Sequence, residues 1–95
     1  MAGRAAKLPV LSGDELNKVL ADLCFRHVRT KGSHKVLERG KHILVVPLHR
    51  ELKRGTLKEI VKAYARILNI SYEEARKLLV DRRLRRRCRS FLCPR

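Results

Sequence analysis

The sequence predicts an α+β domain in the order α-β-β-β-α, with an added C-terminal helix. Three segments have apolar residues at helical spacing, and each begins with a Ser/Thr-x-x-Glu motif that caps helix N-termini. Between the first and second of them lies a stretch rich in β-branched residues, with two glycines that suit tight hairpin turns. A chain of 95 residues is long enough for one such domain with a single modest core.

The first helix is predicted over residues 13–23. Ser12 and Glu15 form its capping box, and four aliphatic side chains follow at positions i, i+3, i+4 and i+7. This apolar stripe consists of Leu16, Val19, Leu20 and Leu23. The residues ahead of this helix contain a short basic arm, which is predicted over 1–7.

Three antiparallel strands are predicted over residues 25–30, 34–39 and 42–48. Lys31-Gly32-Ser33 and Gly40 are the turn candidates between them. The third strand contains a proline, Pro47, which has no N–H to donate to a ladder. We therefore expect this strand to lie at an edge of the sheet or to end at the proline.

Two more capping boxes, Thr56 to Glu59 and Ser71 to Glu74, predict a helix over 57–68 and another behind it. Their apolar stripes complete the predicted core: Leu57, Ile60, Val61, Tyr64, Ile67 and Leu68 in the first, and Ala75, Leu78 and Leu79 in the second. The resulting order is that of double-stranded-RNA-binding domains, although an architecture alone says little about function.

The net charge indicates which classes of molecule the protein binds. A formal charge of +15 favours a nucleic acid, an anionic membrane surface or an acidic protein. Aromatic residues make up only 4% of the chain, which argues against a base-stacking platform of the RRM type. The longest apolar run, Ile43–Leu48, is far shorter than the ~20 residues of a membrane span. We expect no membrane span and no secretory signal.

The C-terminal segment carries a large share of this charge. Residues 82–95 contain seven arginines and no acidic residue. Their apolar residues, Leu84, Cys88, Phe91 and Leu92, fall at helical spacing, so the last helix could continue as a basic amphipathic helix. Like-charge repulsion opposes this, so 81–95 is predicted to be a solvated, partly disordered Arg-rich extension. An RNA-clamping arm and a membrane-surface helix are the alternatives.

The chain has three cysteines, Cys24, Cys88 and Cys93. An odd number at irregular spacing makes a disulfide framework improbable, and a reducing cytoplasm is the default compartment. A zinc site needs four ligands, usually in close pairs, so no metal and no other cofactor is predicted. Cys24 is interpreted as a small apolar residue, rather than as the nucleophile of a Cys–His enzyme with His34.

The densest candidate site is Lys31-Gly32-Ser33-His34-Lys35. Glycine lets a backbone approach a phosphate closely, and two lysines flank a histidine. The ordinary pKa of histidine, ~6.5, suits general acid or base catalysis near neutral pH. The alternative is a basic hairpin turn with an incidental histidine, and composition alone favours that alternative.

A combination of motifs makes a family resemblance specific. Gly32-Ser33-His34 is followed by Val45-Val46-Pro47, then His49, then Glu51-Leu52 through Gly55-Thr56-Leu57. With Leu8-Pro9, Leu11 to Leu16 and Phe25 ahead of it, this run resembles the HicA toxin family of mRNA interferases over residues 8–80. The resemblance implies a double-stranded-RNA-binding-like fold, cleavage of mRNA without the ribosome, and neutralisation by a HicB antitoxin.

The resemblance also implies which residue is catalytic. The family's catalytic histidine belongs to the Gly-Ser-His motif, and is His34 here. We expect Lys31 and Lys35 to bind the scissile phosphate next to Gly32 and Ser33. Many members carry a second histidine in place of Lys35 and a glycine in place of Cys24, and the extension after Val80 is not part of the pattern.

Further basic residues are predicted around this site. Arg50, Lys53 and Arg54 precede the helix over 57–68 and should contact the RNA backbone, helped by the helix N-terminus. His49 either borders the site or makes a loop hydrogen bond. His34 and Val36 share one face of their strand, and either face could point inward.

The predicted function is therefore that of a cytoplasmic toxin, a metal-independent ribonuclease that cleaves mRNA. Its nucleophile is the 2′-OH of the RNA itself, so neither a metal nor a small-molecule cofactor is required. A non-catalytic double-stranded-RNA-binding module and a ribosome-associated basic protein are the alternatives.

Overall fold

The computed structural model describes residues 8–93. Its elements are α1 (Gly13–Asp22), β1 (Arg26–Lys31), β2 (His34–Arg39), β3 (His42–Pro47), α2 (Arg54–Leu68), α3 (Tyr72–Val80) and α4 (Arg82–Leu92). This order confirms the predicted α+β fold with an added C-terminal helix. The predicted arm over 1–7 and the last two residues of the extension lie outside the described residues.

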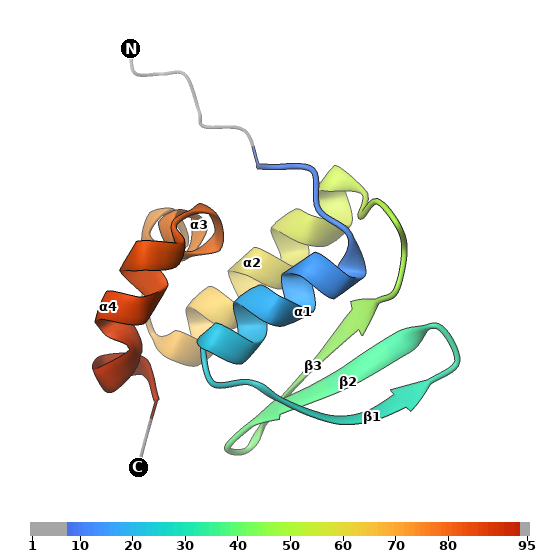
Figure 1. The fold of residues 1–95 in the computed structure, drawn as a ribbon, viewed down its shortest axis with the longest axis horizontal. Helices are drawn as coiled ribbons and strands as arrows, with labels where there is room; N and C mark the ends of the chain where they lie inside the picture. Colours follow the sequence, from blue (N-terminus) through green and yellow to red (C-terminus); the bar gives the residue numbers. More distant parts are fainter. Residues whose placement is uncertain (1–7, 94–95) are drawn as a thin grey trace.

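Helices α1 and α2 both pack on the sheet through β3, while α3 and α4 gather at one end of the molecule (Figure 1). The sheet is antiparallel with the order β1-β2-β3, so β3 with its Pro47 is an edge strand, as predicted. Two-residue turns at Gly32-Ser33 and Gly40-Lys41 join the strands. Both glycines have a φ near +60°, a conformation that costs glycine little.

The strand register decides which side chains face the helices. In β2 and β3, Lys35 pairs with Val46 and Leu37 with Leu44. Leu37, Leu44 and Val46 belong to the buried core cluster, so this face packs against α1 and α2. The alternate positions, His34 among them, lie on the opposite face, which no described helix covers.

The core is built from the predicted apolar stripes. The α1 stripe is buried in full, and so are the three predicted residues of α3. In α2, Tyr64 is fully buried and its hydroxyl donates a hydrogen bond to the carbonyl oxygen of Ala75 in α3. Burial raises the pKa of Tyr64, so the hydroxyl remains a donor at any physiological pH.

Two of the three predicted capping boxes are present, and one prediction is wrong. Ser12–Glu15 and Ser71–Glu74 each make both reciprocal hydrogen bonds. Helix α2 instead begins at Arg54, with Lys53 as an N-cap that makes no side-chain hydrogen bond. Thr56 therefore lies inside the first turn of α2. The helix starts this early because the chain just ahead of it is fixed: Leu52 is buried, and its N–H donates to the Leu11 carbonyl at 2.8 Å.

The prediction of a solvated, partly disordered extension is also wrong. Residues Arg82–Leu92 form a helix, whose N-cap Asp81 accepts a hydrogen bond from the Leu84 amide at 3.0 Å. The apolar stripe of α4 packs against the core, and one of its arginines, Arg85, is buried. Tertiary contacts thus outweigh the repulsion between its charges. None of the helices within 8–93 is long and apolar enough to cross a membrane.

The structure also corrects the expectation about the cysteines. Cys24 and Cys93, which are 69 residues apart in sequence, form a disulfide, and Cys88 is free. Cys24 precedes β1 and has a φ of +73°, in the left-handed region that favours glycine. The pairing arises because α4 folds back to the start of β1, which sequence spacing does not show.

Candidate functional site

The Gly-Ser-His motif forms the turn between β1 and β2 and the first residue of β2. His34 is exposed there, and its register partners are Lys31 on β1 and Pro47 on β3. Side chains directly opposite each other in an antiparallel pair have Cβ atoms ~4.5–5.5 Å apart and share a face. The Lys31 and His34 side chains therefore leave the backbone next to each other on the helix-free face.

Backbone hydrogen bonds fix the surroundings of this hairpin. The Leu48 amide donates to the Ser33 carbonyl at 2.7 Å, and the Gly13 amide donates to the His49 carbonyl at 2.9 Å. A Cβ on Gly13 would collide with the Pro47 carbonyl oxygen, so glycine alone lets α1 approach so closely. The turn, the chain after β3 and the N-terminus of α1 thus meet at one end of the fold, and His49 lies exposed among them.

Lys35, the other lysine predicted to bind the scissile phosphate, does not share the face of His34. It follows His34 in the strand and so points to the helix side of the sheet. Its Nζ lies 3.7 Å from Asp14 Oδ1 on α1, and the lysine side chain is only 29% exposed. Of the two lysines predicted to bind one phosphate, the structure brings Lys31 alone to the face of His34.

The second predicted basic group lies near the same end of the molecule. Arg50, Lys53 and Arg54 are all exposed and follow β3 where the chain passes into α2 (Figure 1). Lys53 is the N-cap residue of α2, and Arg54 is its first residue. Because no side chain caps this helix, its first amides and its positive dipole end remain available to an anion.

One basic residue on the helix-free face is not among those predicted from the sequence. Arg29 pairs with Val36, which shares a face with His34, and Arg29 is exposed. Strand alternation between Arg29 and Lys31 is the signal that could have found it.

Two other histidines lie away from the site: the ring of His27 hydrogen-bonds Thr30 Oγ1 at 3.0 Å, and His42 begins β3 at the opposite end of the sheet.

The site is open and its cations are free. Within residues 8–93 no ion pair and no side-chain hydrogen bond engages Arg29, Lys31 or His34.

The same range contains no group of three or more His, Cys, Asp or Glu that could hold a metal ion. Cys24 is committed to a disulfide at the start of β1, whereas His34 pairs with the end of that strand. The arrangement offers one imidazole for proton transfer and cations for an anionic substrate.

Comparison with known proteins agrees with this geometry. A family model described as the HicA toxin of bacterial toxin-antitoxin matches residues 13–65. The matched region spans more than half of the chain, runs from the start of α1 into α2, and contains the whole sheet with the Gly-Ser-His motif. Neither the curated proteins nor the solved structures contain a significant match. The chain therefore belongs to the HicA toxin family.

Proposed function

We propose that this toxin is a cytoplasmic endoribonuclease that cleaves mRNA, and that His34 is its catalytic residue. One observation supports the proposal above the others. In a chain of this family, the histidine of the Gly-Ser-His motif is exposed on the helix-free face, directly across from Lys31. A buried histidine, or one engaged in a hydrogen bond, would have suggested a structural role instead.

The proposed reaction uses a nucleophile that RNA carries. The 2′-oxygen attacks the adjacent phosphorus, the new O2′–P bond forms, and the P–O5′ bond breaks. The 2′-hydroxyl gives up its proton, and the leaving 5′-oxygen gains one. His34 transfers a proton at one of these two oxygens, an effect typically worth ~10²–10⁴ in rate. Lys31 stabilises the extra negative charge on the phosphoryl oxygens.

The remaining predicted residues have supporting roles in this proposal. Gly32 and Ser33 shape the turn so that the RNA backbone can approach His34. Arg50, Lys53 and Arg54 bind phosphates on either side of the cleaved bond, aided by the free N-terminus of α2. Lys35 pairs with Asp14 on α1, and the proposal gives it no role at the phosphate. His49 borders the site from the segment after β3.

A toxin of a toxin–antitoxin pair has an antitoxin partner, and we propose that it is a HicB-like protein with an acidic surface. A net charge of +15 on the toxin would chiefly accelerate association with such a surface. The helix-free face also exposes Ile43 and Val45, which are 61% and 46% exposed. An antitoxin that covers His34 would bury these side chains as well.

The test compares the wild type with His34→Ala, using His42→Ala as the matched control. His42 is also an exposed histidine, but it lies at the opposite end of the sheet. We expect growth arrest and mRNA loss on induction of the wild type and His42→Ala, and neither with His34→Ala. With purified proteins, His34→Ala should lose at least ~10²-fold in cleavage rate while its circular dichroism stays unchanged.

Two results would contradict the proposal. Cleavage by purified His34→Ala at the wild-type rate would remove His34 from the chemistry. RNA binding without cleavage by either protein would favour the non-catalytic binding module instead.

A further inference from the structure

Helix α4 lies outside the region that the family model matches, and it is anchored firmly to the body of the fold. Its buried arginine, Arg85, donates from Nε to Asp22 Oδ2 at 3.0 Å and from Nη1 to the Leu78 carbonyl at 2.8 Å. At the other end of the helix, the Arg39 guanidinium of β2 donates to the Leu92 carbonyl. The Cys24–Cys93 disulfide follows immediately. The surface that α4 presents is therefore held in one orientation.

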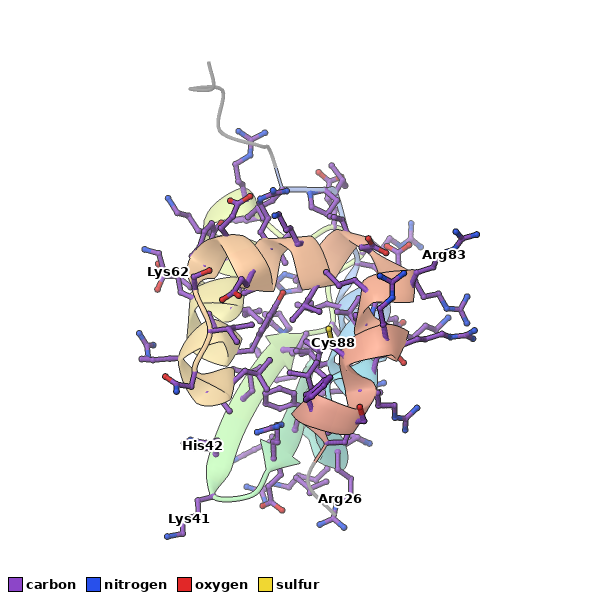
Figure 2. The ribbon with its side chains drawn as sticks, turned by 90° about the vertical axis from the view of Figure 1, so that its left-hand side faces the viewer. Arg26, Lys41, His42, Lys62, Arg83 and Cys88 are labelled. Atoms are coloured by element: carbon purple, nitrogen blue, oxygen red, sulfur yellow. A yellow bond between two sulfur atoms is a disulfide. The ribbon has the colours of Figure 1, made fainter. Side chains whose placement is uncertain are left out.

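The other arginines of the helix form a single exposed face. At ~100° per residue, they lie opposite the stripe of Leu84, Cys88 and Leu92 that packs on the core. Arg83 points away from the molecule while Cys88 points toward it (Figure 2). We call this surface the α4 arginine face; it consists of Arg82, Arg83, Arg86, Arg87 and Arg89, all exposed.

This face differs from the exposed faces of the neighbouring helices. On α2, Lys62 pairs with Glu59, and on α3, Arg76 pairs with Glu73. Helix α4 contains no acidic residue, and no ion pair within residues 8–93 engages any member of its arginine face. Five like charges three and four residues apart destabilise a helix, so an anion bound along them would relieve that repulsion.

The side-chain chemistry selects the anion. Each member of the face is an arginine, whose planar fork makes two parallel hydrogen bonds to a phosphate. A membrane surface would require a free apolar stripe beside the charges. Here that stripe is packed against the core, and Phe91, 87% exposed, is its one outward member. The face therefore fits the phosphodiester backbone of a nucleic acid better than a lipid surface.

We propose that the α4 arginine face binds the backbone of the same RNA whose cleavage we assign to His34; this inference rests on the proposed function. The C-terminal end of α4 contacts Arg39, and Arg39 is separated from His34 by the length of β2, ~17 Å at 3.3 Å per residue. A stacked strand carries one phosphate per ~3.4 Å, so roughly five nucleotides span the length of β2, and an RNA strand that also reaches the α4 arginine face must be longer than that. Backbone contacts of this kind add affinity without reading sequence.

The experiment measures binding of a fluorescent single-stranded RNA over a series of salt concentrations. All proteins carry His34→Ala, so that the RNA stays intact. The test variant adds Arg83→Gln, Arg86→Gln and Arg87→Gln. The matched control instead removes three exposed positive charges from other elements, Lys41→Gln, Arg66→Gln and Lys77→Gln. A third variant replaces the same α4 arginines by lysine, which keeps the charge.

We expect the slope of log affinity against log salt to fall by ~2 in the test variant, because each lost phosphate contact to a single strand removes ~0.7. The control should lose less than half as much, and the lysine variant should keep the parent slope. Equal slopes in the test variant and the parent, with unchanged circular dichroism, would overturn the proposal. So would a test variant that binds RNA normally but fails to bind vesicles of anionic lipid that the parent binds.

The outcomes also separate this proposal from the proposed function. If the wild type cleaves RNA but the α4 substitutions leave the salt slope unchanged, the ribonuclease stands and the α4 contact is wrong. If the wild type cleaves no RNA yet the slope still depends on α4, the binding surface stands and the catalytic assignment is wrong.

Discussion

At the scale of single residues, the two lysines that flank the Gly-Ser-His motif should behave differently. We expect Lys31→Ala to slow RNA cleavage by ~10–100-fold, because it removes a cation across from His34. Lys35→Ala should leave the rate within a few fold. It breaks an ion pair with exposed Asp14, and such surface pairs contribute ~0–1 kcal/mol to stability. Single-turnover cleavage of a short RNA measures the rates, and thermal unfolding checks the fold.

A Lys35→Ala variant as slow as Lys31→Ala would contradict the assignment of the two side chains to opposite faces. That assignment comes from the structure alone. The sequence indicates a strand over 34–39, but its two central residues, Val36 and Leu37, are both apolar. One of them faces the helices and the other is buried within the helix-free face. Hydrophobic alternation therefore cannot decide the direction in which His34 points.

At the scale of elements, the capping boxes provide a test with a built-in control. Ser71→Ala should destabilise the fold by ~1 kcal/mol, because Ser71 accepts from the Glu74 amide while Glu74 accepts from the Ser71 amide. Thr56→Ala removes the same sequence motif from α2, where no capping box forms, and should change the stability by less than ~0.5 kcal/mol. Urea unfolding of both variants measures the difference.

The cost of Ser71→Ala should also depend on pH. Hydrogen bonding from the Ser71 amide lowers the pKa of Glu74 in the folded state. A lowered folded-state pKa means that this contribution is complete above the unfolded value, ~4.3, and is lost as the pH falls through the folded value. Ser71→Ala keeps this amide but loses the hydroxyl, whose hydrogen bond also lowers the pKa of Glu74, so the stability gap between wild type and Ser71→Ala should narrow slightly in acid. Equal losses from Ser71→Ala and Thr56→Ala at neutral pH would contradict the capping assignment.

The elements also show why the sequence favours a disordered extension over the C-terminal helix that forms. Helices α1 and α3 can be predicted from local sequence, because each has a capping box and an apolar stripe whose residues are all buried. Helix α4 depends on Asp22, which is 63 residues from its partner Arg85 in sequence. Considered within the segment alone, the charges of α4 only repel one another. The carboxylate that neutralises Arg85 belongs to another element.

At the scale of the whole molecule, the Cys24–Cys93 disulfide joins the junction of α1 and β1 to the end of α4. It closes most of the chain into one loop, with a sequence separation of 69 residues. In the chain-entropy description, a loop of this size stabilises the folded state by up to ~4 kcal/mol, because it constrains the unfolded chain. Reduction should therefore lower the free energy of unfolding.

Counting free thiols tests the disulfide pairing, and measuring unfolding with and without reductant tests its contribution to stability. The oxidised protein should show one reactive thiol in denaturant, Cys88, and three after reduction. Cys93→Ser should unfold at the same urea concentration with and without reductant, whereas the wild type should shift. Three thiols in the unreduced wild type would contradict the pairing. Under the proposed function the protein works in a reducing compartment, so the reduced form is the one that would meet mRNA. We expect that form to retain its helical circular dichroism, since Arg85 and the apolar stripe of α4 hold the helix independently of the sulfurs.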